Sequence, residues 1–200
     1  MQKLKQLYRS SYAGENVIVQ LTYENGEWNP ETEMVPNQVF NTYTTTQALA
    51  IGNGESRLGF DLTHIANHKG GLFGSNRLQS YATNHVYKSF TPDFLIADDD
   101  WTDELANSGY TNDNIVYAHG KAVMKHPGKF YLIPQNPNFD HNASAAYMAA
   151  FDGHKEVFLL GYTDAETIGQ SEWPIQLESI VKTYSSTKFY HVGNKSSTPN

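Results

Sequence analysis

The chain of 200 residues contains no cysteine, which excludes disulfide bonds, thiolate metal ligands and cysteine nucleophiles. It also lacks any block of basic residues: 14 Lys and Arg stand against 21 Asp and Glu, giving a formal charge of −7. An acidic chain without a basic patch does not attract a nucleic-acid backbone, so we expect no DNA or RNA partner.

Long hydrophobic runs are missing as well. No apolar segment has the length needed to span a membrane, and the first seven residues lack the apolar core of a signal peptide. We therefore expect no membrane partner and a soluble, cytoplasmic protein.

The apolar content of 39% is enough for one domain with a buried core. We predict an N-terminal arm and β-hairpin over residues 1–46. A single Rossmann-like α/β domain follows over residues 47–193, and residues 194–200 form a polar tail.

The predicted hairpin is centred on Asn25-Gly26, because both residues accept the positive φ angles of a type I′ turn. Its strands cover residues 17–23 and 27–35, and Pro30 confines the second strand to a sheet edge or a bulge. Residues 1–13 are expected to form a short helix or a loose arm. An isolated two-stranded ribbon is marginally stable, so we expect this appendage to pack against a second copy in a homo-oligomer.

The rest of the chain is organised around residues 47–61. An apolar run over residues 48–51 predicts a buried strand, Gly52-Asn53-Gly54 a tight corner, and Ser56 the N-cap of a following helix. Such a corner, with room beside its glycines and a helix N-terminus, is typical of phosphate sites. An ordinary strand-to-helix turn without a ligand explains the stretch equally well.

Further strands and helices alternate along the chain. This order predicts an α/β fold with an open, mostly parallel Rossmann-like sheet flanked by helices, plus the N-terminal β-hairpin appendage. Ligands of such sheets bind beyond the carboxyl ends of the strands. The further predicted strands cover residues 71–76, 90–97, 114–117, 129–133, 156–160 and 188–192, and the helices cover residues 101–107, 144–152 and 173–184.

The order of several motifs resembles the bacterial CMP-sialic acid sialyltransferases. It is also similar to the related Rossmann-like family that includes archaeal 6-hydroxymethylpterin diphosphokinase. The motifs are Ile-Gly-Asn-Gly-Glu-Ser at residues 51–56, Gly-Ser-Asn at 74–76, Pro-Asp-Phe-Leu-Ile-Ala at 92–97, Asn-Ala-Ser-Ala-Ala-Tyr-Met at 142–148 and His-Lys-Glu-Val-Phe-Leu-Leu-Gly-Tyr at 154–162.

The resemblance implies a nucleotide or nucleotide-sugar ligand and transfer of a sugar to an acceptor hydroxyl. Two alternatives stay open: diphosphate transfer to a small hydroxymethyl compound, and a non-catalytic binding or structural protein on the same fold. The expected substrate-binding residues are Asn53, Gly54, Ser56, Asn76, Ser144, Tyr162 and Asp164.

Two departures from the sialyltransferases matter. Their proline is Glu55 here, and at ~4 Å a carboxylate repels a phosphate charge by roughly 4 kcal/mol at an effective dielectric constant near 20. Glu55 must therefore point away, bind a cation, or argue against a phosphate ligand. The C-terminal part of the family, which supplies its catalytic base, also has no counterpart in this sequence.

The candidates for catalysis are His141, in a loop expected to overhang the site, and Asp98 at a strand end. A surface histidine without a catalytic role is the simpler interpretation of His141. The run Asp98-Asp99-Asp100 offers oxygen ligands for Mg²⁺, although helix capping is favoured and the sialyltransferases need no metal. We therefore expect no resident metal or other cofactor.

Overall fold

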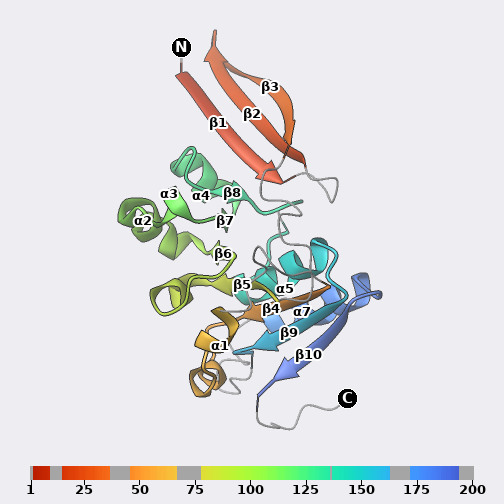
Figure 1. The fold of residues 1–200 in the computed structure, drawn as a ribbon. Coiled ribbons are helices and arrows are strands. Elements are labelled where there is room, and N and C mark those ends of the chain that lie inside the picture. The colour runs from red at the N-terminus through yellow and green to blue at the C-terminus, as the bar shows by residue number, and fades with distance from the viewer. Residues whose placement is uncertain are drawn as a thin grey trace. The chain divides into compact units, whose positions relative to one another are not determined.

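The computed structural model describes residues 2–9, 15–36, 46–66, 78–135, 137–162 and 172–193 (Figure 1). The chain forms two compact units. The first comprises Met1–Thr42 with Ala97–Asn138, and the second comprises Tyr43–Ile96 with Phe139–Asn200. Mostly parallel strands flanked by helices confirm the predicted open, Rossmann-like α/β class.

The second unit is built on a parallel sheet. Its strand order is β10 (Lys188–Val192), β9 (Glu156–Leu160), β4 (Gln47–Ile51), β5 (Gln79–Thr83) and β6 (Phe94–Ala97). The predicted central position of residues 48–51 is confirmed, and Ala50 pairs with Leu159. Sequence periodicity thus identified both strands that form the middle of this sheet.

Strand order reverses beside β4. From β4 the chain continues to β5 and β6 on one side, and it later returns as β9 and β10 on the other side. In open parallel sheets such a switch leaves a crevice beyond the carboxyl ends of the two strands, where ligands bind. The topology therefore points to the residues that follow β4 and β9.

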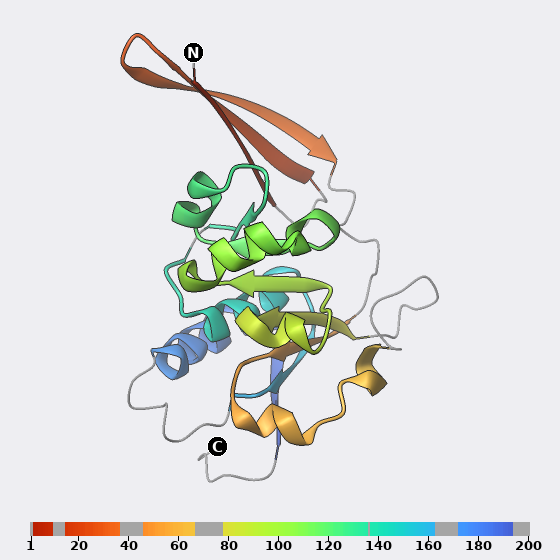
Figure 2. The ribbon, with the colours of Figure 1, turned by 90° about the vertical axis from the view of Figure 1, so that its left-hand side faces the viewer.

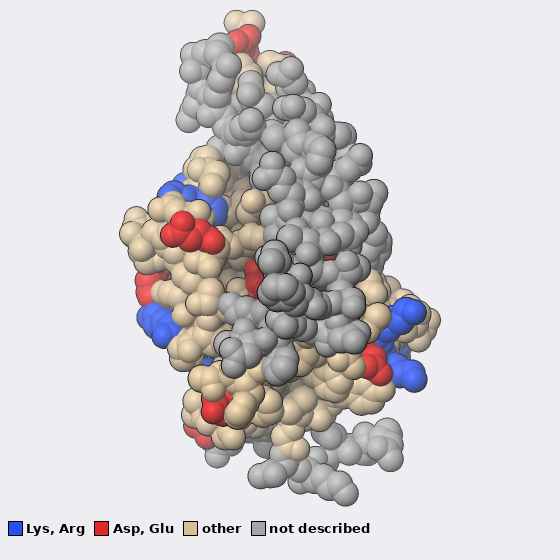
Figure 3. Space-filling model, viewed as in Figure 1, with Lys and Arg blue, Asp and Glu red and all other residues tan. Residues whose placement is uncertain are grey.

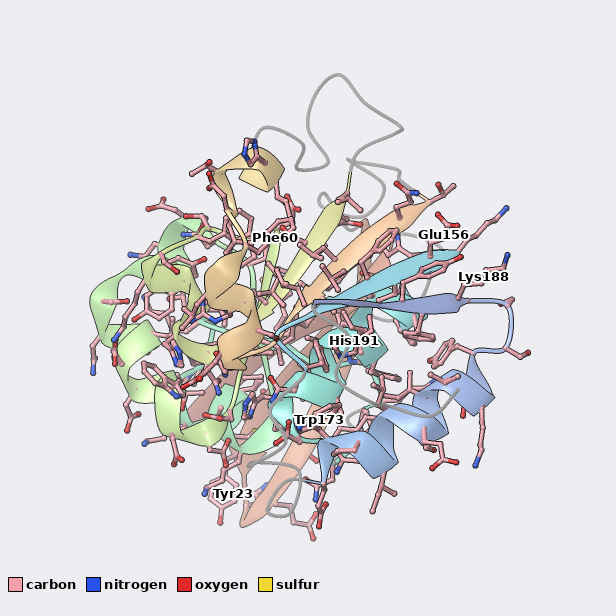
Figure 4. All side chains as sticks on the ribbon, turned by 90° about the horizontal axis from the view of Figure 1, so that it is seen from below. Tyr23, Phe60, Glu156, Trp173, Lys188 and His191 are labelled. Carbon is pink, nitrogen blue, oxygen red and sulfur yellow. The ribbon has the colours of Figure 1, made fainter. Side chains whose placement is uncertain are left out.

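Helix α5 (His141–Phe151) packs across β4, β5 and β9, and α7 (Trp173–Thr183) packs against α5. The five alanines of α5 are buried, as are the side chains of its Tyr, Met and Phe residues. A helix that is apolar on all sides must be covered on all sides, which fits its place between the sheet and α7. Figure 4 labels Trp173 at the start of α7 and Glu156 and Lys188 at the starts of the paired strands β9 and β10.

Strand β5 is polar in sequence and buried in the structure. Ser80 donates its backbone N–H and its hydroxyl to Asp93, at 2.8 Å each, and Asp93 returns a bond from its own backbone N–H to the Ser80 hydroxyl. The hydroxyl of Tyr81 donates to Asp152 at 2.5 Å and lies 3.0 Å from Nε2 of His154. The strand predicted over residues 71–76 lies outside the described residues.

The predicted helix starting at Ser56 is wrong. A short 3-10 helix, η1 (Glu55–Gly59), is followed by an equally brief α1 (Thr63–Ala66), and no side chain caps η1 at Gly54. Ser56 lies inside η1. A five-residue 3-10 helix has no substantial dipole at its N-terminus, so this part of the phosphate argument no longer applies.

In the first unit, β7 (Val116–Ala118) and β8 (Tyr131–Leu132) are parallel, and β8 pairs in parallel with β1 (Gln2–Arg9). Strands β1, β2 (Glu15–Glu24) and β3 (Glu27–Pro36) form an antiparallel ribbon (Figure 2). The hairpin turn is confirmed, because Asn25 and Gly26 have φ angles of 54° and 87°. Pro30 lies in β3, the last strand of the order, as predicted.

Two expectations for the N-terminal segment are wrong. Residues 2–9 form a strand rather than a helix or a loose arm. The hairpin is also not separate from the sheet of its unit, since β1 joins β2 to β8 through backbone hydrogen bonds. Pairing with distant strands, rather than local propensity, gives these residues their extended conformation.

Three helices complete the described part of the first unit: α2 (Asp99–Ser108), α3 (Tyr110–Asp113) and α4 (Gly120–Lys125). Gly109 separates α2 from α3 with a φ of 79°, a conformation that favours glycine. Exposed ion pairs link α2 to the segment of α4: Asp103 contacts Lys125 and His126, both at 2.6 Å.

No helix in the described ranges is long and apolar enough to cross a membrane. On the face shown in Figure 3, basic and acidic side chains of the described residues are interspersed rather than gathered into a broad basic patch.

Candidate functional site

The chain segments that follow β4 and β9 interlock through their backbones. Gly52 donates its N–H to Leu160 O at 2.8 Å, and Gly54 donates to Gly161 O at 3.0 Å. A Cβ on Gly52 would lie 2.6 Å from Gly161 O, and Gly161 has a φ of +80°. Two glycines are therefore required where these backbones cross. Residues 52–57 and 161–162 are named the β4–β9 corner below.

Asn142 ties the corner to α5 and β5. Its Oδ1 accepts from the backbone N–H of Asn53 at 3.3 Å and from the hydroxyl of Thr83, at the end of β5, at 3.4 Å. Its backbone carbonyl accepts from the Tyr162 hydroxyl at 2.6 Å. One amide side chain thus connects the carboxyl ends of β4 and β5, while its backbone is bonded to the residue after Gly161.

The first turn of α5 fixes the position of Asn142. Asp140 caps the helix by accepting from the backbone N–H of Asn142 at 2.8 Å, and Asp140 N donates to Gln176 of α7 at 2.8 Å. His141 is the first residue of the helix, so the prediction that it lies in an overhanging loop is wrong. Its Nδ1 lies 3.7 Å from Oδ2 of Asp140.

Three polar atoms of the corner are buried and have no hydrogen-bond partner in the described structure: Oδ1 of Asn53, Oγ of Ser56 and Nε of Arg57. Folded proteins leave few such atoms, and each requires an explanation such as bound water or a ligand. Their concentration within five consecutive residues, at the topological switch point, makes the corner the strongest candidate site.

The backbone donors of the corner are already used. The N–H groups of Gly52, Asn53 and Gly54 all bind acceptors of the protein. These three amides cannot cradle a phosphate as a glycine-rich phosphate loop does. A ligand at the corner must be recognised mainly by side chains.

Cationic and titratable side chains surround the corner. Burial, followed by repulsion from Arg57, Lys88 and His141, lowers the pKa of His85. Burial also lowers the pKa of Arg57, although its guanidinium stays charged. Glu55 is exposed, whereas the next two residues, Ser56 and Arg57, are partly buried. Arg57 and Lys88 therefore offer positive charge to an anionic ligand beside His85.

A cavity of about 480 Å³ lies beside the corner in the same unit. It is lined by Arg57, Phe60, Asp61, the segment 89–91 and neighbouring apolar side chains. Figure 4 labels Phe60 directly after η1, where its side chain is 39% exposed. Arg57 belongs to both the corner and the cavity, so one ligand can reach both, and the volume is within the range of small-molecule sites.

The structure brings only part of the predicted set together. Asn53, Gly54, Ser56 and Tyr162 meet at the corner, but Gly54 and Tyr162 contribute through packing and internal hydrogen bonds. Burial and the Asp140 carboxylate raise the pKa of the Tyr162 phenol, which keeps it neutral. Trp173 packs edge-on against its ring, at 5.4 Å between centroids.

Ser144 is completely buried, and its hydroxyl donates to Phe139 O at 3.3 Å. It supports the start of α5 rather than facing a ligand. Asp98 belongs to the first unit, where it occupies the position before α2. Asn76 and Asp164 lie outside the described residues.

Within the run of three aspartates at residues 98–100, Asp99 forms an ordinary surface ion pair, with its Oδ2 3.5 Å from Nζ of Lys121. Within the described ranges, no group of three His, Asp or Glu side chains is arranged to hold a metal ion.

Three residues of the site were missed by sequence reasoning: Arg57, His85 and Asn142. Arg57 directly follows Gly-Asn-Gly-Glu-Ser, so its proximity to the corner was available from the sequence. His85 was missed because it lies two residues after the end of β5, a strand that was not predicted from the sequence. Asn142 stands two residues after an Asp suited to cap a helix, but its contact with Asn53 depends on a tertiary arrangement.

Protein-family models, curated proteins and solved structures were each compared with the chain, and none matches it.

Proposed function

We propose that the β4–β9 corner binds the phosphate-bearing part of a nucleotide or nucleotide-sugar, and that the protein is a glycosyltransferase. One observation carries the proposal: Asn53, Ser56 and Arg57 each present a buried polar atom without a partner at the switch point of a parallel sheet. Arg57 and Lys88, whose charges act on the His85 ring, supply the positive charge that a phosphate requires.

The three atoms have complementary roles in this proposal. Arg57 Nε and the Ser56 hydroxyl donate hydrogen bonds to phosphate oxygens. Asn53 Oδ1 is an acceptor, so it receives a bond from a ribose hydroxyl instead. The nucleoside or the sugar then occupies the cavity beside Arg57. Glu55 remains in solvent, where its repulsion is screened.

Sugar transfer would proceed by a single displacement, with His141 as the base. The acceptor oxygen bonds to the anomeric carbon while its proton passes to Nε2 of His141. The bond from that carbon to the phosphate oxygen breaks, and its electron pair leaves with the nucleotide. Asp140, 3.7 Å from Nδ1, stabilises the imidazolium that forms. Arg57 and Ser56 stabilise the charge on the leaving phosphate.

Binding is tested by isothermal titration of the full chain with CMP, UDP, ADP and ATP, with and without Mg²⁺. Asn53→Ala and Ser56→Ala should each weaken nucleotide binding by about 1–3 kcal/mol through loss of a buried hydrogen bond. The exposed residues Asn107 and Ser186 provide matched controls, Asn107→Ala and Ser186→Ala, which should bind like the parent. Flat titrations for every nucleotide would refute the proposal.

Catalysis is tested separately by release of free nucleotide from CMP-sialic acid and UDP-sugars in the presence of acceptor sugars. His141→Gln should abolish release and leave nucleotide binding within about threefold, because it acts on the proton transfer step. Binding only of ATP, and only with Mg²⁺, would instead favour diphosphate transfer.

A non-catalytic binding protein is the second candidate. It is favoured by the fact that only His141, of the two predicted catalytic residues, belongs to the unit that contains the corner. Nucleotide binding without turnover, in the parent as in His141→Gln, would support it. For either function we also propose a homo-oligomer formed through the β1–β3 ribbon, and the cytoplasm as the location, where nucleotides are available.

A further inference from the structure

A second cavity lies in the first unit, between α3 and the turn that precedes β8. Its volume is about 660 Å³, and it is lined by residues 111–115 on one wall and 127–131 on the other. Cavities of this size hold small molecules. All of its lining belongs to the first unit, so it shares no residue with the β4–β9 corner.

The polar lining of this cavity combines donors and acceptors. Thr111 contributes a hydroxyl, Asn112 and Asn114 contribute amides, and Asp113 contributes a carboxylate. Asn114 Nδ2 donates to Tyr110 O at 3.0 Å, which uses one of its donors and fixes the side chain. Hydroxyl-bearing ligands need both kinds of partner, because each hydroxyl donates one hydrogen bond and accepts others.

The Thr111 hydroxyl is an independent indication of a ligand. Its oxygen is buried and has no hydrogen-bond partner within the part of the chain that the structure describes. Thr111 lines the cavity, so a rotation about its Cα–Cβ bond can turn this hydroxyl toward a ligand hydroxyl in the cavity.

The charges of the lining cancel. Asp113 and Lys129 are its only acid and base, and Lys129 Nζ already donates to Asn112 Oδ1 at 2.8 Å, which joins the two walls. Neither an anion nor a cation is therefore favoured. Ile115, Pro127 and Tyr131 add apolar surface, against which the carbon faces of a sugar ring can pack.

We propose that this cavity is a binding site for a neutral saccharide. The proposal rests on the polar lining, the unpartnered Thr111 hydroxyl and the balanced charge, and it does not depend on the function proposed for the corner.

Saturation-transfer NMR of the full chain tests the proposal. The probes are glucose, galactose, mannose, N-acetylglucosamine, maltose and lactose, with glucosamine and gluconate as charged counterparts of glucose. At least one neutral sugar should bind, with an affinity that does not change between low and high NaCl because no charge is neutralised.

Two variants locate the binding. Thr111→Val should weaken sugar binding by about tenfold, the equivalent of one good hydrogen bond, and should not lower the melting temperature because the hydroxyl has no partner to lose. Asp113→Asn should also weaken it. Glu104→Gln, at an exposed position of α2 outside the cavity, is the control and should bind like the parent.

Three results would overturn the proposal. The first is the absence of binding for every neutral sugar in the parent chain. The second is tighter binding of glucosamine or gluconate than of glucose. The third is sugar binding that both Thr111→Val and Asp113→Asn leave unchanged.

Discussion

The carbonyl oxygen of Gly161 lies 2.6 Å from the position that a Cβ on Gly52 would occupy, and Gly52 O lies 2.7 Å from the corresponding position on Gly161. Each glycine therefore makes room for the backbone of the other. The pair holds the carboxyl ends of β4 and β9 together at the place where Asn53 Oδ1, Ser56 Oγ and Arg57 Nε are buried without a hydrogen-bond partner in the described structure.

Replacing Gly52 with alanine should destabilise the protein by about 1–3 kcal/mol, since the added methyl group forces the two backbones apart. Gly59 offers a matched control, because a Cβ there meets nothing within 4 Å and its φ is not positive. Urea denaturation of Gly52→Ala and Gly59→Ala measures the difference. Equal stability of the two variants would show that the corner accommodates the added methyl group without a loss of stability.

Glu55→Gln should change nucleotide affinity by less than about 1 kcal/mol, because an exposed charge is screened by water and salt. This expectation replaces the large repulsion anticipated for a carboxylate inside a phosphate site. Isothermal titration in low and high salt measures the effect. A gain of more than tenfold would place the carboxylate next to the bound phosphate.

The lowered pKa of His85 predicts that the free energy of unfolding depends on pH. Its folded pKa is lowered, so between its usual value of about 6.5 and the lowered value the unfolded chain binds more protons. Stability should therefore fall as the pH decreases through that window, and no contribution from His85 remains above it. Melting curves from pH 7 to pH 5 for the parent and His85→Gln test this, and the variant should show the shallower decline.

A bound phosphate should reverse the effect on His85, because an anion favours the protonated ring. Nucleotide binding near pH 6 should then take up protons, which titrations in buffers of different ionisation enthalpy detect. Proton uptake that persists unchanged in His85→Gln would assign it to another group.

Tyr162→Phe should cost about 0.5–1.5 kcal/mol of stability by removing the 2.6 Å bond to Asn142 O. Because Asn142 Oδ1 binds the backbone of Asn53, nucleotide affinity should decline as well. Tyr190, whose side chain is 39% exposed, provides the control Tyr190→Phe, and thermal melts with and without CMP compare the two. Identical behaviour would separate Tyr162 from the site.

The β1–β3 ribbon is expected to mediate a homo-oligomer. Light scattering of the parent should give a multiple of the single-chain mass of 22.5 kDa. Gly26→Val strains the turn at a φ of 87° and should shift the protein toward that single-chain mass. A parent that already has this mass would remove the expectation.

Sequence reasoning succeeded where the local pattern and the tertiary environment agree. Strands β4, β9 and β10 and helix α7 match the predictions closely because their apolar residues follow the period of each element. The Asn25-Gly26 turn was equally readable, since its backbone conformation is a local property.

Sequence reasoning failed where contacts between residues far apart in the sequence determine the local structure. The polar residues Ser80 and Tyr81 are compatible with a buried strand only because Asp93 and Asp152 accept their hydrogen bonds. The charged segment Gln2–Arg9 is a strand because β2 and β8 pair with it. The candidate site followed the same division: the corner motif predicted the location of Asn53 and Ser56, whereas Asn142 and His85 depend on contacts between segments far apart in the sequence.

The discontinuous second unit affects how the protein is made. Gln47 at the start of β4 donates to Glu156 of β9, 109 positions later, at 2.7 Å. On the ribosome, β4 is synthesised long before β9, so one of its edges has no partner while the first unit's residues 97–138 emerge. Strands waiting for such remote partners fold slowly and expose edges that aggregate. The chain should therefore depend on chaperones during synthesis more than its modest length suggests.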